Sequence, residues 1–259
     1  MAEQTVGFIG AGRVARIILG GLQRAGRMPS RVVASDTNPE VLKQLNAAFS
    51  AVETALNNNR EAAAQDLVFL GLHPPAIMGA LAEIKEVIKP GAMMISLAPK
   101  LSISKISEAL GGFSRIIRLI PNAASIIGQG YNPIAFAPNL GVSEREQVKS
   151  LVGALGECPE VAEDKLEAYA VVVAMGPTYL WFQFEELRTL GESFGLTAEE
   201  THKGLAAMAS GAVATLFDSG MTPEEVIDLI PVKPLGEDEA AIKAAYRARL
   251  EPLYRKLKS

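Results

Sequence analysis

The sequence predicts an α/β protein in two parts: a doubly wound sheet over residues 1–162 and an all-helical domain over residues 163–259. Two observations support this division. Up to about Val161, short β-rich runs alternate with helical stretches, which is the pattern of βαβ units and a mainly parallel sheet. From Lys165 onward β-rich runs are almost absent, and alanine, leucine and glutamate are frequent.

The expected elements of the first part follow in regular order. Asn38 is expected to cap the second helix, with Pro39 at its first position. We expect strands at residues 6–9, 31–34, 66–72, 93–97, 115–119 and 133–137, and helices at 14–24, 39–49, about 76–88 and near 103–110.

The second part carries clear helix signals. Thr197 with Glu200, and Thr222 with Glu225, have the spacing of capping boxes. The pair Gly176–Pro177 interrupts a long apolar helical pattern, so one helix is expected to end or kink there. A charged amphipathic helix is expected over residues 237–258. Because this part is apolar on many faces, we expect it to form a homodimer interface, and a higher oligomer is possible.

Composition excludes several classes of protein. A net charge of −4 argues against a nucleic-acid-binding protein, and 49% apolar with 21% charged residues is typical of a globular protein. The single cysteine, Cys158, and two distant histidines, His73 and His202, predict neither a disulfide framework nor a metal site. No membrane span or secretory signal is recognised, so a cytoplasmic protein is expected.

The strongest motif is the glycine turn Gly10–Ala11–Gly12 between the first strand and the first helix. The first glycine permits a tight turn, and the second lets backbone N–H groups approach a pyrophosphate at the positive end of the helix dipole. We therefore expect a nicotinamide dinucleotide, NAD(P)H, to bind at this turn and at the first helical residues Arg13 and Val14. The alternative is a strand–helix turn without a ligand.

Asp36 directly follows the second strand, where an acid can accept hydrogen bonds from the adenosine ribose and would repel a 2′-phosphate. It favours NADH over NADPH. Alternatively Asp36 is a cap or turn residue.

Four segments resemble the pyrroline-5-carboxylate reductase family, and together they span nearly the whole chain. The glycine turn is shared with many dehydrogenases, whereas the Pro121–Asn122 and Pro177–Tyr179 segments in this order are more specific. The segments are the opening at residues 6–22, Ile116–Asn122 (the family's "IIRxMPN"), Gly176–Tyr179 (within "SGxxPAY") and Phe217–Gly220.

This resemblance implies a Rossmann domain followed by a helical domain that interlocks two subunits. It implies an NAD(P)H-dependent reductase that passes a hydride to a cyclic imine, with proline as product, or to a related small imine or carbonyl acid. In the family the cofactor lies against Asn122 and against the strand end Leu72–His73–Pro74. The substrate lies near the helix after Pro177–Tyr179 and near a loop, "SPGGTT", from the partner subunit.

The departures from the family fall on the substrate side. Residues 230–236 replace "SPGGTT", and their two prolines cannot donate the hydrogen bonds with which that loop holds a carboxylate. The serine and glycine of "SGxxPAY" are apolar here and its alanine is Thr178. The family's lysine before proline is His73, and the glycine of its "SxAAGV" segment is Lys100.

Thr178, Tyr179 and Lys233 are the first candidates for substrate chemistry, and Lys100 and His73 are further ones. Thr178 and Tyr179 could orient a substrate at the start of a helix, although Tyr179 could instead be a core or interface aromatic. Lys233 could pair with a substrate carboxylate or be a solvated loop charge, and Lys100 is open in the same way. His73 could donate a proton or simply end a strand. Asn122 could bind the nicotinamide ribose or carboxamide, or be a turn residue.

Two other functions remain as alternatives. A β-hydroxyacid-type dehydrogenase shares the two-domain plan, but it needs a lysine followed four residues later by asparagine, and residues 165–175 contain no such pair. A cofactor-binding sensor or scaffold that has lost catalysis would also combine an intact dinucleotide turn with an altered substrate side.

Overall fold

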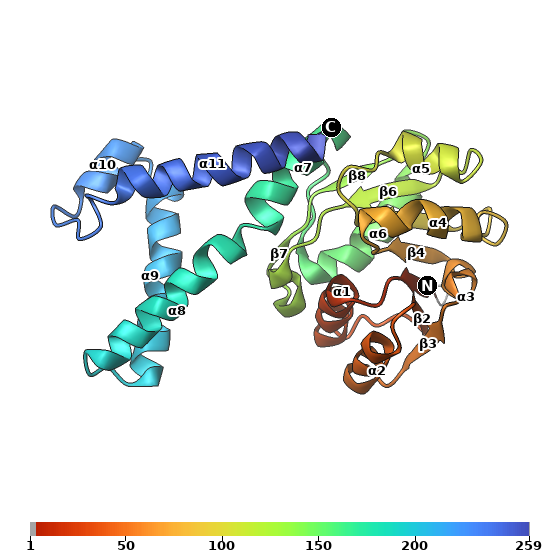
Figure 1. Cartoon of the computed structure of the whole chain (residues 1–259), viewed down its shortest axis with the longest axis horizontal. Coiled ribbons are helices and arrows are strands. Elements are labelled where there is room, and N and C mark those ends of the chain that lie inside the picture. Colours follow the sequence, from red (N-terminus) through yellow and green to blue (C-terminus); the bar gives the residue numbers. More distant parts are fainter. Residues whose placement is uncertain (1–3, 259) are drawn as a thin grey trace. The chain divides into compact units, whose positions relative to one another are not determined.

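The computed structural model describes residues 4–258 and divides the chain into two compact units. The first unit ends at Met175 and also includes the chain from Tyr254 onward; the second runs from Gly176 to Leu253. The fold class agrees with the prediction: a mainly parallel sheet between helices, followed by helices alone (Figure 1).

The first unit contains a seven-stranded sheet in the order β3-β2-β1-β4-β5-β6-β8. All neighbours are parallel except β6 and β8, which are antiparallel. The strand order reverses direction between β1 and β4, which is where doubly wound sheets open a crevice for a ligand. The strands are β1 (Thr5–Ile9), β2 (Arg31–Asp36), β3 (Val52–Leu56), β4 (Leu67–Leu70), β5 (Met93–Ser96), β6 (Ile116–Leu119) and β8 (Ile134–Phe136).

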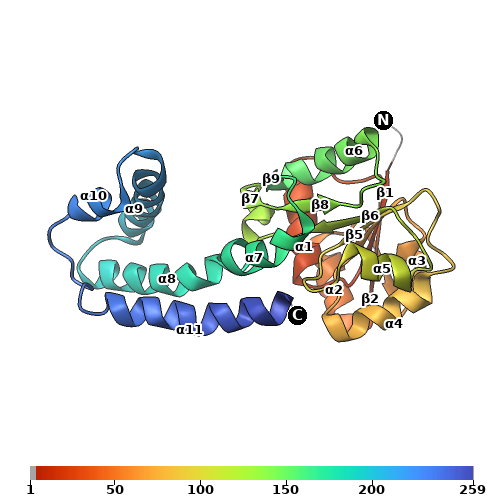
Figure 2. The ribbon, with the colours of Figure 1, turned by 90° about the horizontal axis from the view of Figure 1, so that it is seen from above.

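Helices cover both faces of this sheet (Figure 2). Ile18, Leu45 and Val148 bring the first group of helices into one apolar cluster, and Ile77, Leu81 and Ile106 lie in the cluster on the other face. The first group is α1 (Arg13–Arg24), α2 (Pro39–Ala48) and α6 (Val142–Val152); the second is α3 (Asn59–Ala63), α4 (Pro74–Ile84) and α5 (Ile103–Ala109).

Short elements complete the first unit. The strands β7 (Gly130–Tyr131) and β9 (Gly156–Glu157) pair in parallel apart from the main sheet. The remaining elements are the 3₁₀ turns η1 (Ala123–Ile127), η2 (Gly153–Leu155) and η3 (Glu163–Lys165), the helix α7 (Leu166–Tyr169) and the π-helical turn η4 (Ala170–Ala174).

Most sequence expectations for this unit are confirmed, with differences at the element ends. Asn38 caps α2, accepting a hydrogen bond from the Glu40 N–H at 3.0 Å, with Pro39 at the first position. The helix expected at 76–88 is shorter and begins at Pro74, and the strand expected at 66–72 is reduced to β4. The edge strand β3 and the helix α6 were not expected, because their alternating or charged sequences lack an apolar run.

The second unit consists of helices, as expected. Both predicted capping boxes are present, at Thr197 with Glu200 and at Thr222 with Glu225. The helices are α8 (Pro177–Ser193), α9 (Ala198–Asp218), α10 (Pro223–Asp228) and α11 (Glu239–Lys258), the last of which extends into the residues grouped with the first unit.

The division between the units lies later in the chain than the expected boundary near residue 162. Leu166, Ala170 and Val171 are buried, and Glu167 forms an ion pair with Arg118 of β6, so α7 and the start of η4 pack with the sheet. Gly176–Pro177 then ends this packed segment and begins α8, at the position where the sequence predicts an interruption.

Candidate functional site

The glycine turn lies at the carboxyl edge of the sheet, at the reversal between β1 and β4. Gly10 has φ +97°, and a Cβ there would lie 2.7 Å from the Gly71 carbonyl oxygen, so glycine is required. The Gly10 N–H donates to the Ser35 carbonyl oxygen at 2.9 Å, and the Gly71 N–H donates to that of Ile9 at 2.8 Å. The ends of β1, β2 and β4 are therefore joined around this turn.

Gly12 leaves the start of α1 open to a ligand. It is the N-cap of α1, no side chain caps this helix, and its first turn carries no acid. Within residues 4–258, a Cβ built on Gly12 meets no atom within 4 Å beyond its chain neighbours. Arg13 is exposed and Val14 is half-buried, while Ala11 is fully buried. Free N–H groups at the positive end of a helix fit a pyrophosphate.

Asp36 ends β2 and is half-buried beside the turn. Its Oδ2 accepts the Ala11 N–H at 3.0 Å, and its Oδ1 accepts the Asn38 N–H at 2.9 Å. The carboxylate thus holds the glycine turn and also serves the turn before α2, which is the alternative weighed from sequence. Each oxygen keeps a second lone pair that can accept a ribose hydroxyl.

Asn122 follows β6 and is only 9% exposed. Its N–H donates to Asn132 Oδ1 at 3.2 Å, and the same oxygen accepts the Ser125 hydroxyl at 2.7 Å. The Oδ1 atom of Asn122, by contrast, is buried and has no hydrogen-bond partner among the described residues. A buried acceptor without a donor is costly, so this atom suits a donor brought by a cofactor, such as a hydroxyl or a carboxamide.

The strand end Leu72–His73–Pro74 forms the entrance to α4. A Leu72 methyl carbon lies 3.1 Å from a Cβ built on Gly10, so this side chain packs against the turn. His73 is the exposed N-cap of α4 and makes no capping hydrogen bond with its side chain, and Pro74 is at the first position. His73 therefore ends the strand segment and begins α4. Its contact with a cofactor stays a prediction.

A buried charge cluster at the same edge of the sheet was missed from sequence. The Arg118 side chain is 3% exposed and pairs with Glu167 at 2.6 Å and with Glu163 at 3.1 Å. Glu163 also accepts the Ile103 N–H at 2.7 Å, and Glu167 accepts the Lys100 N–H at 3.3 Å. An arginine within an otherwise apolar strand was the available signal, because a buried cation requires an acidic partner.

Lys100 adopts a backbone conformation that favours glycine. Its φ is +73°, and Asn57 is the one other non-glycine residue of the described chain with a positive φ. Asparagine tolerates this region, whereas the side chain of a lysine there costs about 1–2 kcal/mol. The glycine that the resemblance places at this position explains the local geometry, which the chain keeps despite the substitution.

The three candidate substrate residues all lie on the second unit. Thr178 is exposed, and Tyr179 is half-buried with its ring edge-on to Tyr246 at a centroid distance of 5.9 Å. Burial, and then Tyr246, raise the pKa of Tyr179. Thr178 and Tyr179 line a groove of about 460 Å³ between α8 and α11, and Lys233 lines a larger groove, of about 1320 Å³, that shares Phe182 and Tyr246.

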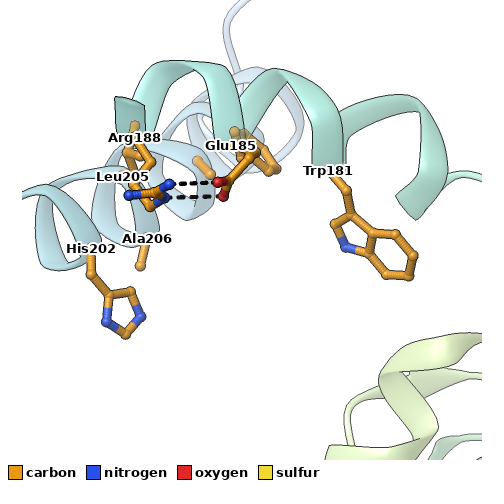
Figure 3. Close-up of a pocket in the computed structure, with 8 residues that line it drawn as sticks. Trp181, Glu185, Arg188, His202, Leu205 and Ala206 are labelled. Carbon is orange, nitrogen blue, oxygen red and sulfur yellow. Dashed lines mark hydrogen bonds and ion pairs between the residues drawn. The ribbon is translucent and has the colours of Figure 1, made fainter. Parts of the chain in front are cut away.

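A further groove, of about 580 Å³, lies between α8 and α9 (Figure 3). Arg188 and Glu185 face each other on α8, with their closest contact at 2.6 Å, and His202 comes from α9. Most of the lining is apolar, with Trp181, Leu205 and Ala206 among its members. An ion pair between neighbouring turns of one helix stabilises that helix.

Residues 4–258 contain neither a metal-binding cluster nor a membrane-spanning helix. No group of three or more His, Cys, Asp or Glu side chains is placed to hold a metal ion in this range. Over the same residues, every helix is too short or too polar to cross a bilayer.

Known proteins resemble the chain in two ways: a family model over its first part, and individual relatives over nearly its whole length. A family model described as "NADP oxidoreductase coenzyme F420-dependent" matches residues 5–100, which run from β1 to the loop after β5. Pyrroline-5-carboxylate reductase 1 of Bacillus subtilis is 27% identical over 244 residues, 93% of this chain and 82% of that protein. The pyrroline-5-carboxylate reductase of Pseudomonas aeruginosa is 26% identical over 245 residues, 94% of this chain and 89% of that protein.

Solved structures agree. A pyrroline-5-carboxylate reductase from Coxiella burnetii matches with a TM-score of 0.70 at 26% identity, covering 99% of this chain and 95% of that one. Plasmodium falciparum pyrroline carboxylate reductase, crystallised with NADP bound, matches with a TM-score of 0.83 at 20% identity, covering 100% and 98%. In sequence and fold, and across both units, this chain is similar to pyrroline-5-carboxylate reductases.

Proposed function

We propose that the protein is an NAD(P)H-dependent reductase that transfers a hydride to the C=N carbon of a small cyclic imino acid, converting pyrroline-5-carboxylate to proline or acting on a close analogue. The observation that carries this proposal is the extent of the similarity. It covers 93% of the chain, including the helical second unit, whereas a shared dinucleotide turn alone would cover the first unit only.

The chemistry asks little of the protein beyond binding and orientation. The reduced nicotinamide, when bound, would supply a hydride to the C=N carbon, so that C=N becomes a C–N single bond, and the ring nitrogen takes up one proton from solvent. The chain's part is to hold a pyrophosphate at Gly12, the ribose near Asp36 and a donor group at Asn122 Oδ1. Each assignment rests on an open or unfilled group: free N–H groups, spare carboxylate lone pairs and an unpaired acceptor.

We further propose a preference for NADH over NADPH. The support is the carboxylate of Asp36 at the end of β2, where a 2′-phosphate would bring a second negative charge. The KM values for both cofactors test this. Asp36→Asn keeps an acceptor for the Ala11 N–H while removing the charge, so it should reduce the difference between the KM values for NADH and NADPH. A wild-type preference for NADPH would remove the assignment.

On the substrate side we propose Thr178, Tyr179 and Lys233 as orienting and charge-pairing residues. Their support is that they line adjoining grooves of α8 and α11. Thr178→Val and Tyr179→Phe each remove one hydroxyl and should raise KM or lower kcat if that hydroxyl orients the substrate. An unchanged KM in Lys233→Ala would leave Lys233 a solvated loop charge.

We also propose that the second unit forms a homodimer. Among residues 176–253, Thr201 alone is buried, so these helices lack a core of their own. Large apolar side chains are left exposed, and burying each would contribute about 1.5–3 kcal/mol. They include Trp181, Phe182, Phe194, Phe217, Ile230 and Val232. A second copy of the same helices is the occupant that the family resemblance favours.

Sedimentation equilibrium tests the dimer. Phe217 is 74% exposed on α9, and Phe217→Glu should shift the protein toward monomer. Ser210→Glu introduces the same side chain and the same change of charge at an exposed polar position of the same helix, and is the matched control. A wild-type monomer at micromolar concentration would contradict the proposal.

The activity is tested by following cofactor oxidation with a panel of cyclic imines that includes pyrroline-5-carboxylate. Turnover at ordinary enzyme rates supports the reductase. Tight binding of NADH with no turnover across the panel would instead indicate a cofactor-binding sensor. The altered loop at residues 230–236 would then account for the loss of turnover.

A further inference from the structure

Lys100 stands in the loop that leaves the carboxyl end of β5, at the edge of the sheet that carries the glycine turn. The Leu97 side chain of this loop lies 3.7 Å from a Cβ built on Gly71, and Gly71 packs against Gly10. The loop therefore adjoins the ends of β4 and β1, where the dinucleotide crevice opens.

The chain keeps a lysine here although the backbone favours glycine. With φ +73°, Lys100 occupies a region in which an L side chain is strained. Strained residues of this kind persist where surrounding contacts hold them, and they concentrate at functional sites. A change to glycine would relieve the strain, so the side chain is retained against a local cost.

The contacts that hold Lys100 are buried and charged. Its N–H donates to Glu167 Oε1 at 3.3 Å, and Glu167, 7% exposed, is paired with Arg118. At the other end of the loop the Ile103 N–H donates to Glu163, the second partner of Arg118. The loop is thus attached at both ends to one arginine of β6, which gives Lys100 a rigid base.

The Lys100 ammonium is available for a ligand. Glu163 and Glu167 both pair with Arg118, and no carboxylate in residues 4–258 is within ion-pair distance of the Lys100 nitrogen. The side chain is half-buried, so an anion that pairs with it is screened less than on an open surface.

We propose that Lys100 binds the substrate's carboxylate and so selects cyclic imino acids over imines that lack this group. This inference rests on the proposed function. The Lys100 ammonium would bind the carboxylate in place of the backbone N–H groups that the two prolines of residues 230–236 lack. This assignment differs from that of Lys233 because Lys100 belongs to the sheet unit, beside the proposed cofactor site.

The test compares pyrroline-5-carboxylate with 1-pyrroline, the same ring without the carboxylate, in wild type and in Lys100→Gly. Glycine suits the backbone at this position, so the variant should fold with a melting temperature at or above that of wild type. We expect the KM for pyrroline-5-carboxylate to rise at least ten-fold, the KM for 1-pyrroline to change less than two-fold, and the Kd for NADH to stay the same. Lys100→Arg should restore part of the affinity, and Lys105→Ala, at an exposed lysine of α5, is the control.

Three results would overturn the assignment. Equal effects on the two imines would mean that Lys100 does not contact the carboxylate. A raised Kd for NADH would mean that its charge serves the cofactor. An unchanged KM in Lys100→Gly with a raised KM in Lys233→Ala would move the role to Lys233.

A binding measurement separates this proposal from the reductase activity. Calorimetry of the cofactor-loaded protein with pyrrole-2-carboxylate, a planar ring acid that needs no turnover, reports on the carboxylate site directly. If the wild type reduces no imine but binds this acid, and Lys100→Gly does not, the carboxylate site stands and the reductase is wrong. If the wild type shows neither turnover nor binding, both are overturned.

Discussion

Replacing Gly12 by alanine distinguishes a cofactor site from a strand–helix turn without a ligand. Gly12 has φ −73° and ψ −155°, at the edge of the extended region that L residues adopt, and a Cβ added there meets no atom within 4 Å apart from chain neighbours in the described chain. The variant should therefore fold, with a free energy of unfolding changed by less than about 1 kcal/mol.

The cost should appear on binding. The methyl group would occupy the space through which a pyrophosphate oxygen approaches the N–H groups of α1. Losing one hydrogen bond to a charged group costs roughly 1.5–3 kcal/mol, and about 1.4 kcal/mol corresponds to ten-fold in affinity. We therefore expect the Kd for NADH to rise roughly 10- to 150-fold in Gly12→Ala.

Fluorescence titration with NADH, alongside urea unfolding, measures both quantities. Gly79→Ala is the matched control: Gly79 is exposed in α4, and its added Cβ also meets no atom within 4 Å beyond the helix itself. It should gain up to about 1 kcal/mol in stability and leave the Kd unchanged. Unaltered NADH affinity in Gly12→Ala would refute the pyrophosphate site, and loss of folding would refute the packing argument.

Three further predictions concern the stability and reactivity of the first unit. Glu167→Gln should lower the free energy of unfolding by about 3–5 kcal/mol, because it leaves Arg118 buried beside a weaker partner. Glu163→Gln changes a side chain that is 33% exposed and should lower it much less, so equal losses in urea unfolding would contradict this prediction. Hydrogen bonds from Lys89 and then Thr5 hold the pKa of Asp66 below its usual 3.8, so its contribution to stability is present above that pH and is lost as pH falls through the lower folded-state pKa. Asp66→Asn should therefore flatten the stability–pH curve below about pH 4, and an unchanged slope there in urea unfolding would count against this. Burial raises the pKa of the Cys158 thiol from 9.0 to about 12, so at pH 8 a thiol reagent should label it about a thousand-fold more slowly than in the urea-unfolded chain; labelling at comparable rates would show that the thiol is accessible and ionised.

The geometry of the glycine turn could be predicted from the sequence because it depends on local backbone requirements. Gly10 and Gly12 lie in one turn, and the need for a positive φ at the first and for open space at the second can be inferred from residue type and context. Asp36 was harder, because a carboxylate after a strand can serve a turn, a ligand or both. The structure shows it accepting two backbone N–H groups, which a sequence cannot distinguish from a ribose contact.

The charge cluster of Arg118 could have been anticipated only in part. A buried arginine in β6 requires an acid, but the acids are 45 and 49 residues later in the chain, in η3 and α7. Their pairing with Arg118 also explains why the first unit extends past residue 162, since it attaches α7 to the sheet. The positive φ of Lys100 could not be predicted from its residue type, because lysine itself favours the right-handed region.

The departures from the family pattern fall on positions that the resemblance assigns to substrate binding, where more than one arrangement can hold the same group. A hydride donor needs the same pyrophosphate and ribose contacts whatever it reduces, so the glycine turn tolerates little change. A carboxylate can be held by loop N–H groups or by one lysine, and replacing the first by the second leaves the fold intact. Residues 230–236 contain two prolines, which cannot donate such hydrogen bonds, and our proposal is that Lys100 provides the second arrangement from a loop held by Glu167. Because the second unit lacks a core of its own, substrate affinity should be measured on the homodimer. There the difference in KM between pyrroline-5-carboxylate and 1-pyrroline reports the contribution of the carboxylate, and Lys100→Gly shows how much of it comes from Lys100.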